Sequence, residues 1–408
     1  MPTPSPTTAD TLALGRQLLI GNYARLPIVL ARAHGSRLYD SEGREYLDLF
    51  AGFGGTVLGH AHPALVGAVR QQAETLWAVG NTYYSTPQID LAADLARHAF
   101  PGQAFFCHSG AEANETAVKL ARLKGHQDGG KKWKTISLHK SFHGRTLAMI
   151  AATGNPTYRV GFEPTVPGFL QVDGGDFDAL TAAIDDETAA ILMEPIQGEG
   201  GINEYPADYP ARVRQLCDER GITLIFDEVW TGGGRTGRWF AHQYFKMPDG
   251  SPVLPDIMTL GKAVGAGLPV GAMWAKPEIA KLLVPGTHGN TLGANPICMA
   301  VAHAAMRVIE TENLVAHAEQ LGNHAVARLK GEPKLKDKVA AIRGKGLMLG
   351  VELKTVPPAG FVERGLAKGV ALNLTAKTVV RLAPAINISA QDWDLGLDRL
   401  TEVLAHES

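Results

Sequence analysis

The sequence predicts an α/β protein with a mostly parallel central sheet flanked by helices, accompanied by a smaller α+β domain. Between residues 103 and 262, short apolar runs alternate with helical stretches, a pattern typical of parallel strands joined by helices. Polar residues follow several of these runs, at the strand ends where open α/β sheets bind ligands. Beyond Asn295-Pro296 the alternation gives way to a long Ala-rich region, which indicates a second structural unit.

Size and composition indicate a globular protein with more than one domain. The chain has 408 residues, with 45% hydrophobic and 20% charged residues, and chains of this size usually form more than one core. We expect an N-terminal segment (1–57) that packs with a small domain, a large domain (58–296) and a C-terminal small domain (297–408). The formal net charge of −2 argues against a nucleic-acid or membrane partner, since both attract basic surfaces.

Cysteine usage and the N-terminus predict a cytoplasmic protein. Cys107, Cys217 and Cys298 are odd in number and widely spaced, which suits reduced thiols rather than disulfides or a CxxC metal site. The run Met1–Pro6 lacks the basic and apolar parts of a signal peptide. No apolar run approaches the length that crosses a membrane.

The elements follow in order from local patterns. We expect the first ten residues, polar and Pro-rich, to be disordered. Residues 36–49 read as a hairpin with a turn at 40–43, and 63–79 as an amphipathic helix. The remaining strands are expected at 103–107, 134–138, 188–193, 221–226, 257–261, 340–346, 347–353 and 379–384, and the remaining helices at about 112–124, 209–220, 297–329 and 391–406.

Two of these strands end on a carboxylate and an amine. Asp227 follows the strand 221–226, and Lys262 follows the strand 257–261. Pyridoxal phosphate needs an acid for its ring nitrogen and an amine that condenses with its aldehyde. For an isolated Asp and Lys, an ordinary salt bridge at a strand end is the better interpretation, so the assignment depends on the other motifs.

A third strand end has the features of a phosphate site. Ser109, Gly110 and Ala111 lie between a strand and a helix. Small residues let the backbone approach an anion, and a helix N-terminus offers free N–H groups and a favourable dipole. A simple helix cap is the alternative.

Two further strand ends carry aromatic and charged side chains. Phe142 could stack on a ring cofactor, and Arg145 could hold a carboxylate through two hydrogen bonds. The alternative places Phe142 in the core and Arg145 on the surface. Glu194 and Glu199 are crowded among glycines after another strand, where Glu199 could neutralise an arginine and Glu194 could support the cofactor pocket.

Two motifs suggest functions that we do not assign. The glycine-rich run 231–237 lacks the Gly-Lys-Ser/Thr ending of a nucleotide loop and the setting of a dinucleotide fingerprint, so we interpret it as a flexible connector. His60 and His62 have no third metal ligand at a suitable spacing, and we expect a structural role at the start of a helix.

Together the motifs resemble class III pyridoxal-phosphate aminotransferases of fold type I, and within that class the acetylornithine/ornithine aminotransferase group. The resemblance extends from about Asn22 to the last helix, with the motifs in family order. They are Asn22–Pro27, Leu58–Pro63, Ser109–Glu115, Phe142–Thr146, Glu194–Gly201, Asp227–Val229, Thr259–Ala263 and Val380–Pro384.

The resemblance implies roles for the cofactor-binding residues. Lys262 would hold the cofactor covalently and later move a proton, and Asp227 would pair with its ring nitrogen. Phe142 would stack on the ring. The other expected cofactor contacts are Ser109, Gly110, Ala111, Glu194, Val229, Trp230 and Thr291. In this family the threonine comes from the partner subunit, so a homodimer with a shared active site is implied.

The resemblance also implies a substrate site. Arg145 would hold the carboxylate of 2-oxoglutarate or the distal end of the amino donor. Arg381 would take the α-carboxylate of glutamate, and Glu199 would cover or release Arg381 according to the substrate. Tyr23 would line the entrance.

Three positions depart from the family pattern. Trp230 stands where the family usually has a glutamine that contacts the phenolic oxygen of the cofactor, and an indole offers one donor only. Asn290 replaces the usual serine next to Thr291 in the substrate site. Phe53 occupies a position where ornithine-selective members carry tyrosine and acetylornithine members an aliphatic residue. These changes leave the donor open.

The expected reaction is a ping-pong transamination from an ω-amino donor to 2-oxoglutarate, giving a semialdehyde and glutamate. N-acetylornithine is the first donor we expect, followed by ornithine, succinylornithine and 4-aminobutyrate. Another pyridoxal-phosphate reaction on the same scaffold, such as an aminomutase or a decarboxylase, is one alternative. A cofactor-free binding protein is a more distant one.

Overall fold

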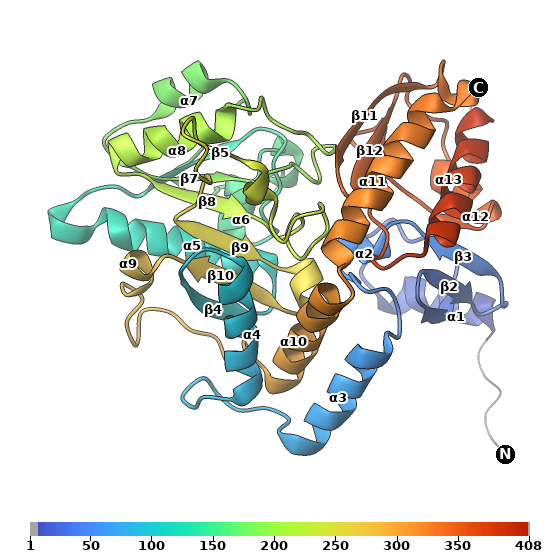
Figure 1. The fold of residues 1–408 in the computed structure, drawn as a ribbon, viewed down its shortest axis with the longest axis horizontal. Helices are drawn as coiled ribbons and strands as arrows, with labels where there is room; N and C mark the ends of the chain where they lie inside the picture. The colour runs from blue at the N-terminus through green and yellow to red at the C-terminus, as the bar shows by residue number, and fades with distance from the viewer. Residues whose placement is uncertain (1–6, 407–408) are drawn as a thin grey trace.

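The computed structural model describes residues 7–406, apart from the side chain of residue 128. Its central sheet has seven strands in the order β4-β10-β9-β8-β7-β5-β6 (Figure 1). These are β4 (Gln103–Cys107), β5 (Lys134–Leu138), β6 (Phe169–Val172), β7 (Thr188–Met193), β8 (Thr223–Asp227), β9 (Ile257–Leu260) and β10 (Gly271–Ala275). Strand β10 runs antiparallel to both of its neighbours, and the other pairs are parallel. The predicted mostly parallel sheet is confirmed.

Helices cover both faces of this sheet, because its strands are apolar on both sides. Residues that alternate along β7 and β8 divide between two cores: Leu192 and Ile225 pack with α5 (Gly110–Gly125) and α6 (Leu147–Ala152), whereas Met193 and Phe226 pack with α8 (Tyr209–Arg220). Helix α7 (Phe177–Ala183) joins the second core, and α9 (Pro277–Ala280) joins the first.

The C-terminal part of the chain forms a second unit together with the N-terminal strands. Strands β1 (Leu30–His34), β2 (Arg37–Asp40) and β3 (Glu45–Asp48) form a sheet with β13 (Val370–Ala371), and β13 pairs in parallel with β3. A third sheet has the order β11-β12-β15-β14, from β11 (Val339–Lys345), β12 (Met348–Leu353), β14 (Asn373–Thr375) and β15 (Val379–Leu382). Figure 1 shows the blue N-terminal strands next to the red C-terminal helices. The exact domain boundaries stay a prediction.

Several helices complete these units. Helices α11 (Leu314–Gly331), α12 (Phe361–Ala367) and α13 (Ala390–Ala405) cover the C-terminal sheets, and α1 (Thr8–Leu18) and α2 (Ala51–Gly54) belong to the N-terminal part. Short 3-10 helices lie at Gln127–Gly129 (η1), Pro156–Tyr158 (η2), Ala241–Tyr244 (η3), Lys262–Gly265 (η4) and Pro333–Leu335 (η5). Within residues 7–406, no helix is both long and apolar enough to cross a membrane.

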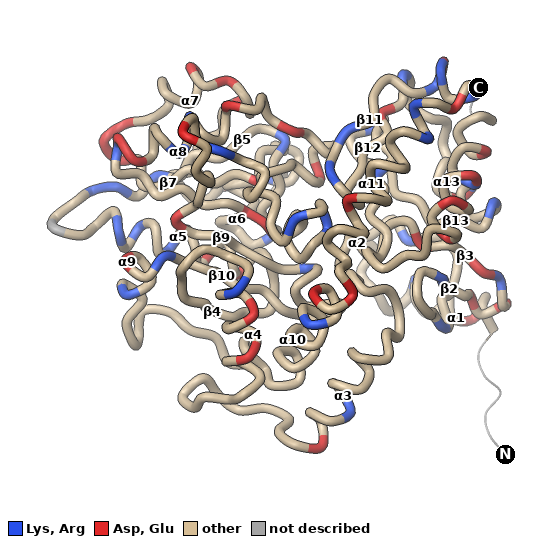
Figure 2. The backbone as a smooth tube through the Cα atoms, viewed as in Figure 1, with Lys and Arg blue, Asp and Glu red and all other residues tan. Residues whose placement is uncertain are grey.

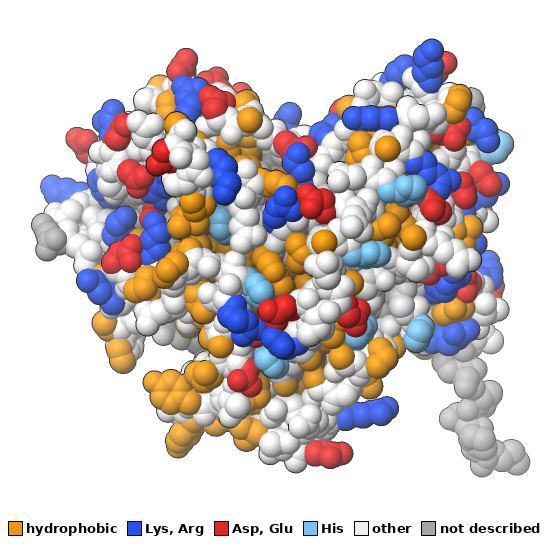
Figure 3. Space-filling view, viewed as in Figure 1, with side chains coloured by type: hydrophobic (Ala, Val, Ile, Leu, Met, Phe, Trp, Pro, Cys, Tyr) orange, Lys and Arg blue, Asp and Glu red, His pale blue; other side chains and the backbone are white. Residues whose placement is uncertain are grey.

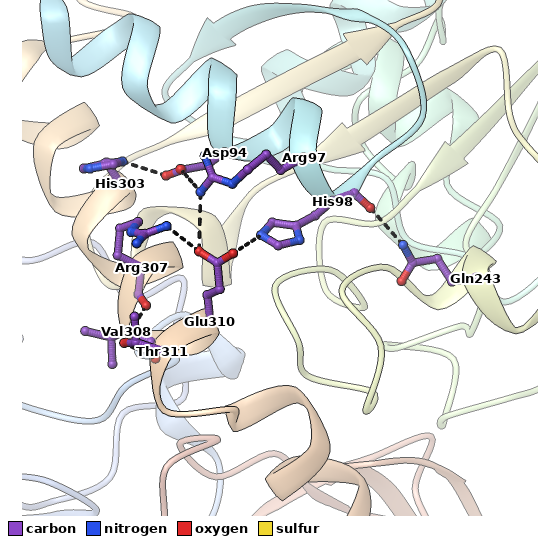
Figure 4. Close-up of polar contacts among 9 residues, drawn as sticks. All are labelled: Asp94, Arg97, His98, Gln243, His303, Arg307, Val308, Glu310 and Thr311. Carbon is purple, nitrogen blue, oxygen red and sulfur yellow. Dashed lines mark hydrogen bonds and ion pairs between the residues drawn. The ribbon is translucent and has the colours of Figure 1, made fainter.

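Helix α10 (Pro296–Thr311) packs against α3 (Pro63–Thr75) and α4 (Thr86–His98). Charged side chains join α4 and α10 at their ends (Figure 4). Buried Asp94 accepts a hydrogen bond from Nδ1 of His303 at 2.7 Å and from Arg97 at 2.5 Å, and Arg97 also faces Glu310 at 3.4 Å. The amide of Gln243 donates to the His98 carbonyl at 2.9 Å, which attaches the segment after the glycine-rich run to α4.

Three sequence-based predictions need correction. Residues 8–10 are helical rather than disordered, because Thr7 and Asp10 form a reciprocal cap at the start of α1; residues 1–6 lie outside the described part. The helix expected over 63–79 ends at Thr75. The region 297–329 is two helices, because Asn313 has a φ of 53° and breaks the hydrogen-bond ladder between α10 and α11.

The glycine-rich run 231–237 is not a flexible connector. All seven residues are buried. Arg235 donates hydrogen bonds to the carbonyls of Leu347 and Pro384, and Leu347 donates its own N–H to the Arg235 carbonyl at 2.9 Å. Glycines 233, 234 and 237 have positive φ values, so here glycine serves a tight, buried path between the two units.

Candidate active site

Asp227, the last residue of β8, is held by hydrogen bonds on both carboxylate oxygens. Oδ2 accepts from Nδ2 of Asn114 at 2.7 Å and pairs with Nδ1 of His143 at 2.8 Å. Oδ1 accepts from the backbone N–H of Val229 at 3.0 Å. The side chain is 3% exposed. A buried carboxylate fixed in this way suits a partner that carries a protonated ring nitrogen.

Asn114 links this carboxylate to two neighbouring elements. Its amide also donates to the His143 carbonyl at 2.9 Å, and its Oδ1 accepts from the hydroxyl of Thr259 at 2.6 Å. Asn114 lies on α5, Asp227 on β8 and Thr259 on β9. Asn114 and His143 lie within two of the motifs found in the sequence, but their contacts with Asp227 were not predicted. Both residues follow strands that lead into candidate site motifs, and this position could have identified them from the sequence.

Lys262 follows β9 and begins η4 with a φ of 44°. A left-handed backbone costs a residue with a side chain about 1–3 kcal/mol, and such strain concentrates at functional sites. Burial lowers the pKa of the Lys262 ammonium below its ordinary value, and the carboxylates of Glu199 and Asp227 partly oppose this. A lowered pKa increases the neutral fraction of the amine, which is the nucleophilic form.

The N-terminus of α5 lies against the residues that follow β8 and β9. Ser109 caps the helix: its hydroxyl accepts from the N–H of Glu112 at 3.2 Å. A Cβ at Gly110 would approach Cγ1 of Val229 to 2.6 Å, and one at Gly261 would approach the Gly110 nitrogen to 3.2 Å. A side chain at either glycine would crowd the place where the N-terminus of α5 meets the residues that follow β8 and β9.

Glu194 fixes the loops on both sides of the site. Oε2 accepts from the N–H of Phe142 at 3.1 Å, and Oε1 accepts from the N–H of Gly198 at 3.0 Å. Burial raises the pKa of Glu194 to about 7, while His143 opposes the rise and Asp227 adds to it. Glu194 therefore holds the backbone at Phe142 and Gly198, and its support of a cofactor pocket stays a prediction.

Trp230 forms a wall of the site and not a polar contact. The indole is 3% exposed, and its Nε1 has no hydrogen-bond partner among the described residues. Its ring centroid lies 4.5 Å from Nζ of Lys262 and 4.6 Å from Cζ of Arg381. The indole contacts both functional cations, and it lies against Gly54 and Gly198, where a side chain would collide with it.

Arg381 and Glu199 form an ion pair that the sequence predicted only in part. Nη1 of Arg381 lies 2.9 Å from Oε1 of Glu199, and Nε donates to Oδ1 of Asn373 at 2.8 Å. Arg381 is 2% exposed and lies on β15 of the C-terminal sheet. Burial lowers the pKa of Arg381, whereas Glu199 opposes that effect. The site thus lies between the central sheet and the C-terminal unit.

The remaining predicted residues lie at the edge of this group. Arg145 is exposed, and its guanidinium lies over the ring of Tyr158. Phe53 is 51% exposed and contacts Phe50 edge-on, with ring centroids 4.7 Å apart. Tyr23 is 69% exposed, next to Arg25, so this chain by itself does not bring it to the other site residues.

The segment with Asn290 and Thr291 is attached to β4. Nδ2 of Asn290 donates to the Phe106 carbonyl at 3.0 Å, and its Oδ1 accepts from the N–H of Gly293 at 2.8 Å. Thr291 is exposed. Asn290 therefore shapes the loop that presents Thr291, and the contact expected between Asn290 and a substrate stays a prediction.

Of the two histidines set aside as structural, His60 has a side-chain partner, whereas Nδ1 of His62 has none among the described residues. Nε2 of His60 pairs with Oδ2 of Asp48 at 3.1 Å, and His62 is the N-cap residue of α3. Across residues 7–406, no group of three or more His, Cys, Asp or Glu side chains is arranged to hold a metal ion.

The arrangement fits pyridoxal phosphate. The cofactor carries a basic ring nitrogen, an aldehyde and a phosphate, and the site offers the fixed Asp227 carboxylate, the Lys262 amine and the N-terminus of α5. A model of the class III aminotransferases matches residues 20–404. The chain belongs to this family. It is a class III aminotransferase that uses pyridoxal phosphate, as the sequence predicted.

Named relatives are similar to this chain over almost their whole length. The acetylornithine aminotransferase of Aquifex aeolicus is 42% identical, covering 95% of this chain and 99% of that protein. The acetylornithine aminotransferase of Methanocaldococcus jannaschii is 44% identical, covering 93% and 94%. These likenesses extend across both structural units of this aminotransferase.

Solved structures of two aminotransferases have the same fold. The ornithine aminotransferase of Toxoplasma gondii superposes with a TM-score of 0.91 at 32% identity, covering 98% of this chain and 96% of that one. The N-acetylornithine aminotransferase of Stenotrophomonas maltophilia has a TM-score of 0.80 at 33% identity, covering 97% and 98%. A second Toxoplasma gondii structure, with a TM-score of 0.90, is described with pyridoxal phosphate at its active site.

Proposed function

We propose that this aminotransferase moves the amino group of N-acetylornithine to 2-oxoglutarate, giving a semialdehyde and glutamate. The relatives named acetylornithine aminotransferases, at 42–44% identity, support this donor. One structural observation supports the use of two different substrates. Arg381 is paired with Glu199, whereas Arg145 has no ion pair or hydrogen bond among the described residues.

Each residue has a distinct task in this proposal. Lys262 holds the cofactor through its amine and later moves a proton at the amine-bearing carbon of the substrate. Asp227, oriented by Asn114 and His143, keeps a proton on the ring nitrogen. When bound, the cofactor supplies an electron sink for the carbon that loses its proton.

The two arginines distinguish donor from acceptor. When Glu199 pairs with Arg381, that guanidinium is neutralised, and an ω-amino donor can bind without placing its α-carboxylate there. When glutamate or 2-oxoglutarate binds, its α-carboxylate displaces Glu199 and takes Arg381. Arg145 then receives the distal carboxylate.

Ornithine is the second candidate donor. The ornithine aminotransferase of Toxoplasma gondii has the same fold at a TM-score of 0.91, and Phe53 places an aromatic ring at the edge of the site. Phe53 lacks the hydroxyl expected of ornithine-selective relatives and is not the aliphatic residue expected of acetylornithine relatives, so this position does not decide between the two donors.

Single-turnover kinetics test the donor. The cofactor-loaded enzyme is mixed with N-acetylornithine, ornithine, succinylornithine or 4-aminobutyrate, and the loss of cofactor absorbance gives kcat/KM for each half-reaction. We expect N-acetylornithine to have the largest value, by at least about tenfold, which corresponds to about 1.4 kcal/mol. A higher value for ornithine would transfer the proposal to that donor.

Lys262→Ala tests the assignment of the covalent link. We expect no turnover and no absorbance band from a lysine-bound cofactor, because the substitution removes the buried amine that interacts with Asp227. The matched control is Lys276→Ala: Lys276 pairs with Asp256 outside the site, and this variant should keep both properties. A lysine-linked cofactor in Lys262→Ala would contradict the assignment.

We infer further that two copies share the active site, with Thr291 reaching the phosphate of the partner subunit. Exposed hydrophobic side chains support this inference: Trp77 is 67% exposed, Tyr84 is 91% exposed and Leu292 is 56% exposed. Figure 3 shows hydrophobic side chains over the loop between α3 and α4. Large apolar surfaces of this kind usually mark an interface. We also propose that the protein is cytoplasmic.

Subunit complementation tests the shared site. Lys262→Ala and Thr291→Ala homodimers are each expected to be impaired. In a hybrid of the two, one site has both substitutions and the other has neither, so we expect up to half of the wild-type activity per dimer. Mixed subunits that recover no activity above the parents would show that Lys262 and Thr291 act within one chain.

A further inference from the structure

The Arg145 side chain is held by aromatic rings. Its Cζ lies 3.7 Å from the ring centroid of Tyr158 and 5.4 Å from that of Phe142. Among the described residues, no carboxylate or carbonyl accepts a hydrogen bond from it. A guanidinium stacked on a ring keeps its N–H groups, which lie in its own plane, free for a ligand.

Hydrogen bonds from Arg159 fix the loop that carries Tyr158. Its guanidinium donates to the carbonyls of Ile150 and Thr153, at 3.2 and 2.6 Å, and to the side-chain oxygen of Gln171 at 2.7 Å. Asn155 caps the same turn by accepting from the N–H of Thr157 at 3.1 Å. Tyr158 is therefore presented by a rigid turn and not by a free loop.

Tyr158 also connects Arg145 to the rest of the site. Its ring meets that of Phe142 edge-on, at 5.9 Å between centroids and an angle of 89°. Tyr158 and Glu199 line the same cavity, of about 730 Å³, which also contacts Thr375 and Val379 of the C-terminal unit. One ring thus contacts the two residues expected to stack on the cofactor and bind the distal carboxylate, and it shares a cavity with the partner of Arg381.

We propose that Tyr158 is a positioning residue that holds Arg145 ready for the distal carboxylate of a dicarboxylic acceptor. This inference rests on the proposed role of Arg145. The ring face supports the guanidinium plane, so that two parallel N–H groups can meet a carboxylate without a further loss of side-chain freedom on binding. The ring provides this support, and the hydroxyl is not needed for it.

The test compares Tyr158→Leu, which keeps an apolar side chain but removes the π face, with Tyr158→Phe, which keeps the ring. The pyridoxamine form of each enzyme is reacted with 2-oxoglutarate or with 2-oxobutanoate, which lacks the distal carboxylate. For Tyr158→Leu we expect KM for 2-oxoglutarate to rise about 3- to 30-fold with kcat nearly unchanged. KM for 2-oxobutanoate should not change, and Tyr158→Phe should behave as wild type.

Equilibrium binding gives an independent readout. The dissociation constant of glutarate, an unreactive dicarboxylate, is measured from the cofactor absorbance and should rise in Tyr158→Leu by the same factor as KM. If Tyr158→Leu does not retain cofactor, Tyr158→Met, which is more flexible, takes its place. An equal rise in KM for both acceptors would overturn the proposal, because it would indicate a general structural defect.

Arg145→Ala distinguishes an error in the role proposed for Tyr158 from an error in the role proposed for Arg145. If Arg145→Ala leaves the preference for 2-oxoglutarate over 2-oxobutanoate intact, the role of Arg145 is wrong, and the role of Tyr158 fails with it. If Arg145→Ala removes the preference but Tyr158→Leu matches Tyr158→Phe, only the positioning role is wrong. In Arg145→Ala/Tyr158→Leu, we expect no loss beyond that of Arg145→Ala alone.

Discussion

Trp230 occupies a space that two glycines leave open. A Cβ at Gly198 would lie 2.1 Å from Cε3 of the indole, and one at Gly54 would lie 2.4 Å from its Nε1. A glutamine, which the family usually has at this position, is narrower than an indole. The three residues therefore form a matched set in this chain, in which the aromatic ring replaces a polar contact and lies against Lys262 and Arg381.

This packing predicts the outcome of Gly198→Ala. We expect the free energy of unfolding to fall by about 1–3 kcal/mol, because the added methyl group must displace the indole or the loop backbone. In a Trp230→Gln background, the same Gly198→Ala change should cost much less, because the indole it collides with is absent. Urea denaturation measures both, with Gly15→Ala as a control, since a Cβ at Gly15 meets nothing within 4 Å. Equal losses with and without Trp230 would contradict the matched set.

Glu228, the residue next to Asp227, fixes the conformation of the segment after β8. Glu228 is 1% exposed. Oε1 accepts from the N–H of His242 at 2.8 Å and pairs with its Nδ1 at 3.0 Å, and Oε2 accepts from the N–H of Ala241 at 2.9 Å and from the hydroxyl of Thr231. One carboxylate thus closes the loop 229–242. Of the two adjacent acids, Asp227 belongs to the site and Glu228 to the scaffold.

Glu228→Gln tests this scaffold role. The amide replaces one acceptor oxygen by a donor that faces a backbone N–H or a hydroxyl, so we expect a loss of about 1–3 kcal/mol in the free energy of unfolding. Amide hydrogen exchange at residues 241 and 242 should become faster. Glu219→Gln, an exposed change on α8, serves as the control. Unchanged exchange at both amides would argue against this account.

At the scale of the whole molecule, Arg235 joins the units that surround the site. It is fully buried, and it donates to the carbonyls of Leu347 at 3.2 Å, Pro384 and Gly54 at 3.5 Å. Burial lowers the pKa of Arg235 to about 10, with Asp48 opposing the shift. Basic and acidic residues are otherwise interspersed along the chain (Figure 2), in keeping with the small net charge of −2.

Arg235→Met should weaken the contacts between the N-terminal segment and the C-terminal unit. Carbonyls from the N-terminal segment and the C-terminal unit would lose their donor while remaining buried, so we expect the free energy of unfolding to fall by at least about 3 kcal/mol. Arg238→Met is the matched control, because Arg238 is partly exposed and pairs with Glu319; its loss should stay within about 1 kcal/mol. If chemical denaturation gives the same loss in the free energy of unfolding for both variants, Arg235 does not hold the two units together.

The sequence by itself determined five strands of the central sheet and the pair at its strand ends, whereas β6 and β10 were not predicted. Asp227 and Lys262 could be found because each follows a short apolar strand, and parallel strands bring their carboxyl ends to the same edge. The helix N-terminus at Ser109, where we expect the phosphate to bind, was predictable for the same local reason. Such features depend on residues that are neighbours in the chain.

The tertiary structure decided what the rest of the site contacts. Trp230 lies between Gly54 and Gly198 and against Arg381, and Tyr158 lies under Arg145. The glycine-rich run was expected to be flexible, yet burial and Arg235 fix it. These contacts join segments that are distant in sequence, and composition and local spacing do not say which distant side chain fills a space or meets a charge; packing of the whole chain settles that.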